Sequence, residues 1–140
     1  MEITENRLKH ILAVANKMEA AVRKNPQAYT IRPEDAFVLG FLHDIGYKFA
    51  DTQSEHAHKG GLVLKSEGCP FWLEIYCHGD PRATYSSAEL DLLNFCDMTT
   101  GPDGRNMTIT ERLKDIKERY GADSKQLNDA IEIVSKFTSL

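Results

Sequence analysis

The chain has 140 residues, of which 41% are hydrophobic and 27% charged. It is therefore long enough to bury one hydrophobic core and too apolar for a disordered chain. The formal net charge of −4, with no block of basic residues, argues against a surface that binds a nucleic-acid polymer.

The three cysteines have no CxxC spacing, so the sequence predicts neither a disulfide framework nor a thiolate zinc site. The N-terminal residues show no signal pattern, and the longest apolar run, "AFVLGFL", is too short to span a bilayer. We therefore expect a cytoplasmic protein with no membrane partner.

Two helices are predicted in the first third of the chain. Apolar residues with spacings of three and four predict an amphipathic helix from Glu5 to about Lys24, ended by Asn25-Pro26: Leu8, Ile11, Leu12, Ala15, Met18 and Val22. Pro33 suits the first turn of a second helix, which we expect to run to Gly46. Its apolar residues fall on all sides, which predicts a central, buried helix.

The middle of the chain predicts shorter helices. Residues 47–54 have the polar composition of a loop, and a third helix fits residues 55–68, closed by Gly68. A fourth helix fits residues 69–81, bounded by Pro70 and Gly79. A fifth fits residues 86–97, with Ser86 as its cap and Glu89 three positions later.

After a turn-rich loop at residues 101–106, two more helices complete the chain. One begins behind Thr108 and ends at Gly121. Its charge-rich sequence, "ERLKDIKERY", is typical of a solvated face. The other begins at an Asp123 cap, with an apolar stripe of Leu127, Ala130, Ile131 and Val134. The pattern predicts an all-α, single-domain helical bundle of six to seven helices over residues 1–140.

His43 and Asp44 stand out because they follow the most apolar stretch of the chain. Burying an unpaired carboxylate costs several kcal/mol, roughly, or forces it to take up a proton. Two solutions are open at this point: a buried His–Asp hydrogen bond, or a metal ion bound between helices.

Other candidate ligands lie at the ends or flanks of apolar helical segments. They are His10 on the flank of the first helix, His56 and His58 at the start of the third, His78 after the fourth and Asp97 at the end of the fifth. Taken singly, each of these residues is more typical of a surface or capping position. Their repetition over five helices favours a shared metal site.

The ordered set His10, His43-Asp44 and Asp97 resembles the HD-domain superfamily of metal-dependent phosphohydrolases. The similar segments are "RLKHILAVA", "FLHDIGY" and "NFCDMTT", within residues 7–112. "HAHKGGLVL" and "IYCHGD" also resemble segments of branches with two metal ions. The resemblance implies one ion held by His10, His43, Asp44 and Asp97, and a second held by His56 and His78, with Asp44 bridging them. It assigns no role to His58.

The resemblance also implies a function: hydrolysis of a phosphate ester or anhydride by metal-activated hydroxide, the substrate being a nucleotide or another small phosphorylated metabolite. Mixed histidine and carboxylate ligands suit one or two divalent ions of Fe, Mn, Co, Ni or Zn. Lys48, Arg82 and Arg105 are candidates for binding substrate phosphates.

One departure from the family keeps two other interpretations open. Many members have a lysine directly after "HDIG", whereas Tyr47 occupies that position here and the lysine is Lys48. A non-catalytic, metal-containing module that binds or senses a nucleotide is the main alternative. An interior polar network without metal is the third.

Overall fold

The computed structural model describes residues 3–138, and this part of the chain contains seven α-helices, three 3₁₀ turns and no strand. The helices are α1 (Glu5–Lys24), α2 (Pro33–Leu42), α3 (His56–Ser66), α4 (Trp72–Cys77), α5 (Ala88–Met98), α6 (Ile109–Tyr120) and α7 (Lys125–Thr138). The predicted all-α class is confirmed. Within the same residues, no helix combines the length and the hydropathy needed to cross a membrane.

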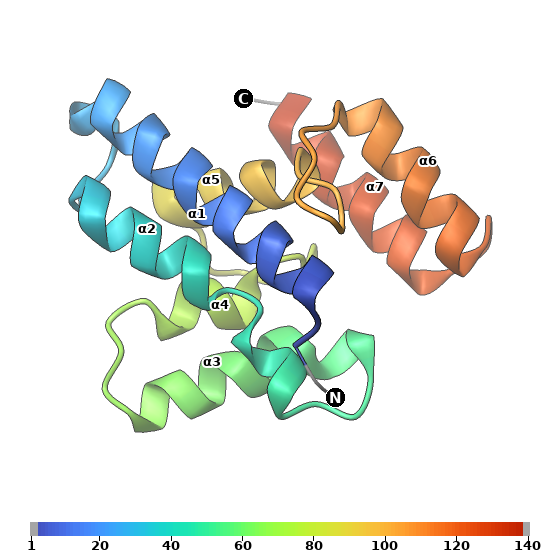
Figure 1. Ribbon diagram of the computed structural model, residues 1–140, viewed down its shortest axis with the longest axis horizontal. Helices are drawn as coiled ribbons and strands as arrows, with labels where there is room; N and C mark the ends of the chain where they lie inside the picture. Colours follow the sequence, from blue (N-terminus) through green and yellow to red (C-terminus); the bar gives the residue numbers. More distant parts are fainter. Residues whose placement is uncertain (1–2, 139–140) are drawn as a thin grey trace.

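The helices form two unequal groups (Figure 1). Helices α1 and α2 lie side by side, α3 and α4 lie beneath them, and α6 and α7 form a hairpin at the other end of the molecule. The main hydrophobic cluster joins α1 to α5 and includes Val14, Met18, Leu39, Ile75 and Leu93. A smaller cluster joins the hairpin to the end of α5: Met98, Ile116, Leu127, Ala130 and Ile133.

Helix α1 has the predicted bounds, but its buried face is rotated from the predicted stripe. Leu8 and Leu12 are 43% and 38% exposed, whereas Val14 is fully buried. The stripe was wrong at these two positions because spacing alone does not show which edge of an apolar face the neighbouring helices cover. The rotation places His10 inside the protein.

Helix α2 ends at Leu42, four residues before the predicted stop at Gly46. The His43 amide donates to the Gly40 carbonyl, and Asp44 has φ −103° and ψ 12°, so the chain leaves the α-helix at His43 and continues into the 3₁₀ turn Ile45–Lys48. Such tightening is common at the last turn of a helix.

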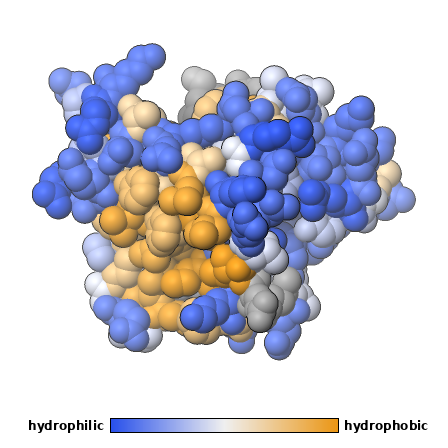
Figure 2. All heavy atoms as spheres, in the orientation of Figure 1, coloured by the Kyte–Doolittle hydropathy of each residue, from blue (hydrophilic) through white to orange (hydrophobic). Residues whose placement is uncertain are grey.

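The expectation that the second helix is buried on all sides is also wrong. Ala36, Leu39 and Gly40 are buried, whereas Val38 and Phe41 are 43% and 40% exposed. Figure 2 shows apolar side chains on this side of the molecule, over the region of α2, α3 and α4.

Two predicted caps are displaced by one residue. Helix α5 is capped by Ser87 rather than Ser86, because the Ser87 hydroxyl accepts from the Leu90 amide. Helix α7 is capped by Ser124 rather than Asp123, because the Ser124 hydroxyl accepts from the Leu127 amide. By contrast, α6 has the predicted Thr108 start, with a capping box to Glu111, and Gly121 at its end.

The buried stripe of α7 differs from the predicted one at one position. Ile131 is 48% exposed, whereas Ile133 is buried against Leu127 and Ala130. Leu127, Ala130 and Ile133 are spaced three residues apart, and they lie on the face of α7 that packs against α5 and α6.

Three glycines allow close backbone contacts, two of them between the turn after α2 and α3 and the third between α3 and α4. A Cβ on Gly46 would lie 1.6 Å from the His56 carbonyl oxygen, and one on Gly60 would lie 2.8 Å from the Gly46 nitrogen. A Cβ on Gly61 would lie 2.7 Å from the Cα of Tyr76. The obstacles are backbone atoms, which cannot move aside cheaply, so any larger residue must separate the elements.

We therefore expect Gly61→Ala to destabilise the protein. Alanine gains about 1 kcal/mol over glycine in a helix interior, but forcing an extra carbon into a packed contact costs about 1–3 kcal/mol or more. The midpoint of chemical denaturation should fall. Lys59→Ala, at an exposed position of the same helix, is the control and should leave the midpoint within error; an unchanged or raised midpoint for Gly61→Ala would contradict the close contact.

Candidate metal centre

Six predicted ligand residues from five separate segments meet in the structure. His10 comes from α1, His43 and Asp44 follow α2, His56 begins α3, His78 follows α4 and Asp97 lies near the end of α5. His10, His43, Asp44 and His78 are buried. Groups of three among these six residues place their ligand atoms within 4.8 Å of one another, so the cluster could hold a metal ion.

One half of the cluster surrounds a single oxygen of Asp44. Asp44 Oδ2 lies 3.6 Å from His10 Nε2 and 3.3 Å from His43 Nε2. Asp97 Oδ1 completes this half, at 2.9 Å from His10 Nε2 and 3.6 Å from His43 Nε2. The four side chains come from α1, the turn after α2 and α5.

The other half surrounds the second oxygen of the same carboxylate. Asp44 Oδ1 lies 3.3 Å from His56 Nε2 and 3.5 Å from His78 Nε2. The two imidazole nitrogens are 3.1 Å apart. Asp44 therefore stands between two imidazole pairs, with one oxygen directed at each.

All four histidines are oriented by their own backbone surroundings. Nδ1 of His10 lies 2.9 Å from the Gly101 carbonyl, and Nδ1 of His43 lies 2.6 Å from that of Gly40. Nδ1 of His56 lies 2.5 Å from the carbonyl of Gln53, and Nδ1 of His78 lies 2.6 Å from that of Ile75. A carbonyl only accepts, so each Nδ1 carries a proton and each neutral ring directs the Nε2 lone pair inward. Metal-binding histidines are typically held in this way.

The distances fit a shared cation better than a hydrogen-bond network. Two Nε2 lone pairs at 3.1 Å, as in His56 and His78, repel each other unless a proton or a metal ion lies between them. With metal–ligand bonds of about 2.1 Å, neighbouring ligand atoms are about 3.0 Å apart at right angles and about 3.4 Å at tetrahedral angles. The fully buried Nε2 of His43 also has no hydrogen-bond partner among the described residues, so a ligand bond would satisfy it.

The electrostatics of the cluster keep its carboxylates charged. Burial by itself raises the pKa of Asp44 and Asp97, but the surrounding histidines outweigh it and hold both pKa values well below the usual range. Burial likewise lowers the pKa of His10 and His43, and the two carboxylates outweigh it, so both pKa values are raised. Both sets of shifts favour positive charge beside the two carboxylates.

A cavity of about 440 Å³ opens onto this cluster and is lined by His10, Asp44, His56, His78 and Asp97. Of the three cations predicted to bind phosphate, Arg82 lines the cavity, where its guanidinium group donates to both oxygens of Asp129 at 3.0 and 3.1 Å. Lys48 and Arg105 are exposed and do not line the cavity. Arg105 instead pairs with Asp103 at 2.9 Å.

Sequence reasoning missed Arg7 and the role of Tyr47. The Arg7 guanidinium lies 3.4 Å over the Tyr47 ring and 3.7 Å from Asp44 Oδ2. The other contact of Tyr47 is a stack on His56, with ring centroids 4.2 Å apart. Burial, together with the charge of Asp44, raises the pKa of Tyr47. The position three residues before His10, on the same helix face, was the available signal for Arg7.

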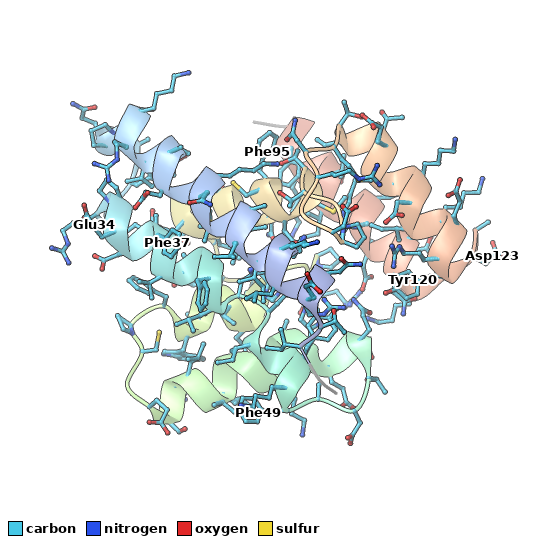
Figure 3. The ribbon with its side chains drawn as sticks, in the orientation of Figure 1. Glu34, Phe37, Phe49, Phe95, Tyr120 and Asp123 are labelled. Atoms are coloured by element: carbon cyan, nitrogen blue, oxygen red, sulfur yellow. The ribbon has the colours of Figure 1, made fainter. Side chains whose placement is uncertain are left out.

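The α6–α7 hairpin supplies the wall of the cavity that the sequence did not indicate. Arg112, Arg119, Tyr120 and Lys125 line it, so the face of α6 predicted to be solvated is in part a cavity wall. Figure 3 shows Tyr120 on the side of the hairpin toward α1, with Asp123 at the outer edge. His58, which had no predicted role, also lines the cavity, stacked on Tyr76 at 4.3 Å and 3.5 Å from Asp80.

Comparisons with family models, with curated proteins and with solved structures give no significant match to the chain. The geometry of the cluster is therefore the basis for a functional conclusion.

The cluster predicts that metal ions stabilise the protein. A ligand that binds only the folded state stabilises it by RT ln(1 + [L]/Kd), about 2.7 kcal/mol at a hundred times Kd. After chelation, adding Mn, Fe(II), Co, Ni or Zn should raise the melting temperature. Asp44→Asn should lose this rise, whereas Asp91→Asn, at an exposed site of α5, should keep it. An equal rise in both variants would place the metal elsewhere.

The same stabilisation should depend on pH. Metal binding must displace protons from imidazoles, two of which have raised pKa values. In the metal-free protein these histidines stabilise the fold at low pH and lose that contribution as the pH rises through their raised pKa values. The metal-induced rise in melting temperature should therefore be larger at about pH 8 than at about pH 6. A rise independent of pH would exclude histidine ligands.

Proposed function

We propose that the protein is a metal-dependent phosphohydrolase that cleaves a phosphate ester or anhydride of a nucleotide or another small phosphorylated metabolite. In this proposal, His10, His43, Asp44 and Asp97 hold one divalent ion, and His56 and His78 hold a second one that Asp44 also contacts. The proposal agrees with the resemblance of the sequence to the HD-domain superfamily.

The single observation that carries the proposal is the position of Asp44. Its two oxygens face two different imidazole pairs, at distances of 3.3 to 3.6 Å. A carboxylate between two cations can hold them a few ångströms apart, the arrangement with which two-metal enzymes act on both oxygens of an in-line displacement.

Bound divalent ions would supply Lewis acidity and lower the pKa of water from 15.7 toward about 7. The chain supplies the remaining parts. The four histidines are held by backbone carbonyls, so their orientation does not have to be fixed during the reaction. Arg7, 31% exposed at the edge of the cluster, can donate two hydrogen bonds to a phosphate.

The non-catalytic alternative has one observation in its favour. Lys48, the counterpart of the lysine that many family members carry after "HDIG", lies outside the cavity. A module that binds or senses a nucleotide would keep the metal cluster and the cavity without turnover. Tight nucleotide binding by metal-loaded protein that forms no product would identify this case.

Hydrolysis is tested with chelated protein reloaded with each transition metal and assayed against nucleotides and phosphomonoesters. We expect phosphate release from at least one compound. Loss of a group that only supports a metal ligand typically costs about 10–100-fold, so Asp44→Asn, which changes a ligand, should lower kcat/KM by at least about a hundredfold. Asp91→Asn is the matched control.

Elemental analysis accompanies the assay, so that a negative result is informative. Metal-loaded protein that releases no phosphate from any compound would overturn the proposal. Protein that retains no metal at neutral pH would favour the third interpretation, a polar network inside the fold.

A further inference from the structure

The guanidinium group of Arg112, on the cavity wall, is only partly hydrogen-bonded. Its side chain is 16% exposed, and its Nε is buried without a hydrogen-bond partner among the described residues. Among residues 3–138, the guanidinium is paired only through Nη1, to Asp115 Oδ2 at 3.2 Å. A buried N–H without an acceptor is costly, and such groups are rare in folded proteins unless a ligand or water satisfies them.

The charges around Arg112 do not cancel. Arg119 lines the same cavity and donates to the same carboxylate, Asp115, at 3.2 Å. Two guanidinium groups thus share one aspartate. The neighbouring cations Arg82 and Lys125 share Asp129 and are balanced further by Asp80, 3.5 Å from Arg82. The unbalanced positive charge therefore lies at Arg112 and Arg119.

We propose that Arg112 and Arg119 form a second anion-binding site, on a wall of the cavity separate from the metal cluster. Guanidinium groups bind phosphate and carboxylate in fork-like geometry, and the N–H groups of Arg112 and Arg119 that are neither buried nor directed at Asp115 are the donors for such an anion. If the proposed phosphohydrolase function holds, the substrate carries a second phosphate or carboxylate in addition to the phosphate that is cleaved. The cavity, about 440 Å³, has the size of sites that enclose small metabolites.

The arrangement of the hairpin supports a ligand that reaches both walls. Tyr120, at the end of α6, lines the same cavity as Tyr47, and Tyr47 stacks on His56 of the metal cluster. The helix that carries Arg112 and Arg119 thus forms a wall of the cavity onto which the metal cluster opens. A molecule bound by both the metal cluster and the Arg112–Arg119 pair would be anionic at two ends.

The test compares anions that carry one charged end with anions that carry two. Propylphosphonate and α,ω-alkanediphosphonates with two to five methylene groups are not cleaved by hydrolysis, and their binding to metal-loaded protein is measured by calorimetry. We expect the best diphosphonate to bind at least about tenfold more tightly than propylphosphonate, the effect of one charge-assisted pair of hydrogen bonds. ω-Phosphonocarboxylates of the same lengths distinguish a phosphate from a carboxylate as the second anion.

Arg112→Gln should remove most of this tenfold preference and leave the affinity for propylphosphonate unchanged. Lys117→Gln, which removes an exposed cation of α6 outside the cavity, should keep the preference. Arg119→Gln, at a residue whose side chain is 53% exposed, tests the same site with little risk to folding. Melting temperatures establish that each variant is folded.

Two results would overturn the inference: no diphosphonate binds more tightly than propylphosphonate, or the preference persists in both arginine variants. These outcomes are separate from failure of the proposed function. Phosphate release with no diphosphonate preference rejects only the second anion site. A preference that depends on Arg112, in protein that cleaves no phosphate compound, rejects only the hydrolase.

Discussion

The structure depends on one electrostatic constraint: four imidazole lone pairs and two ionised carboxylates converge in a largely buried place. Their mutual repulsion is large at low dielectric, and each lone pair left without a partner adds a further cost. The backbone nevertheless commits every histidine to this direction, because each Nδ1 is held by a carbonyl of its own segment or of the loop after α5. A cation bound among them would satisfy these side chains together, which would account for the convergence of five separate segments at one place.

Convergence requires close approach of backbones, and the sequence provides it with small residues and an early helix end. Helix α2 stops at Leu42; His43 keeps helical backbone angles, and Asp44, with φ −103° and ψ 12°, begins the turn that leaves the helix. Gly46 and Gly60 then bring the following turn against the start of α3, where His56 lies. The irregular turn is therefore part of the site.

Much of this could be predicted from the sequence, for identifiable reasons. Helix ends are marked by local signals such as Pro33, Thr108 and Gly121, and these predictions were confirmed to within a few residues. Ligand-type residues at the ends or flanks of apolar segments gave seven candidates, and the resemblance to the HD-domain superfamily selected the six that meet in the cluster. Lys48 could not be placed, because adjacent residues of a 3₁₀ turn point about 120° apart and Tyr47, rather than Lys48, faces inward. Arg112 and Arg119 were missed because cations spaced along a polar helix have the pattern of a solvated face until a partner surface is known.

The two hydrophobic clusters divide the fold into a part that carries the candidate metal ligands and a part that forms the opposite wall of the cavity. Ligands for metal come from α1 to α5, around the main cluster, while the second wall comes from α6 and α7, which have a small cluster of their own. Met98 belongs to that small cluster and follows Asp97 directly, so the hairpin is attached at the edge of the metal centre. Changes in the hairpin can therefore alter the charge and shape of the cavity with little effect on the packing around the histidines. If the proposed function holds, this division confines the strict distance requirements of metal binding to one part of the fold and leaves ligand selection to the other.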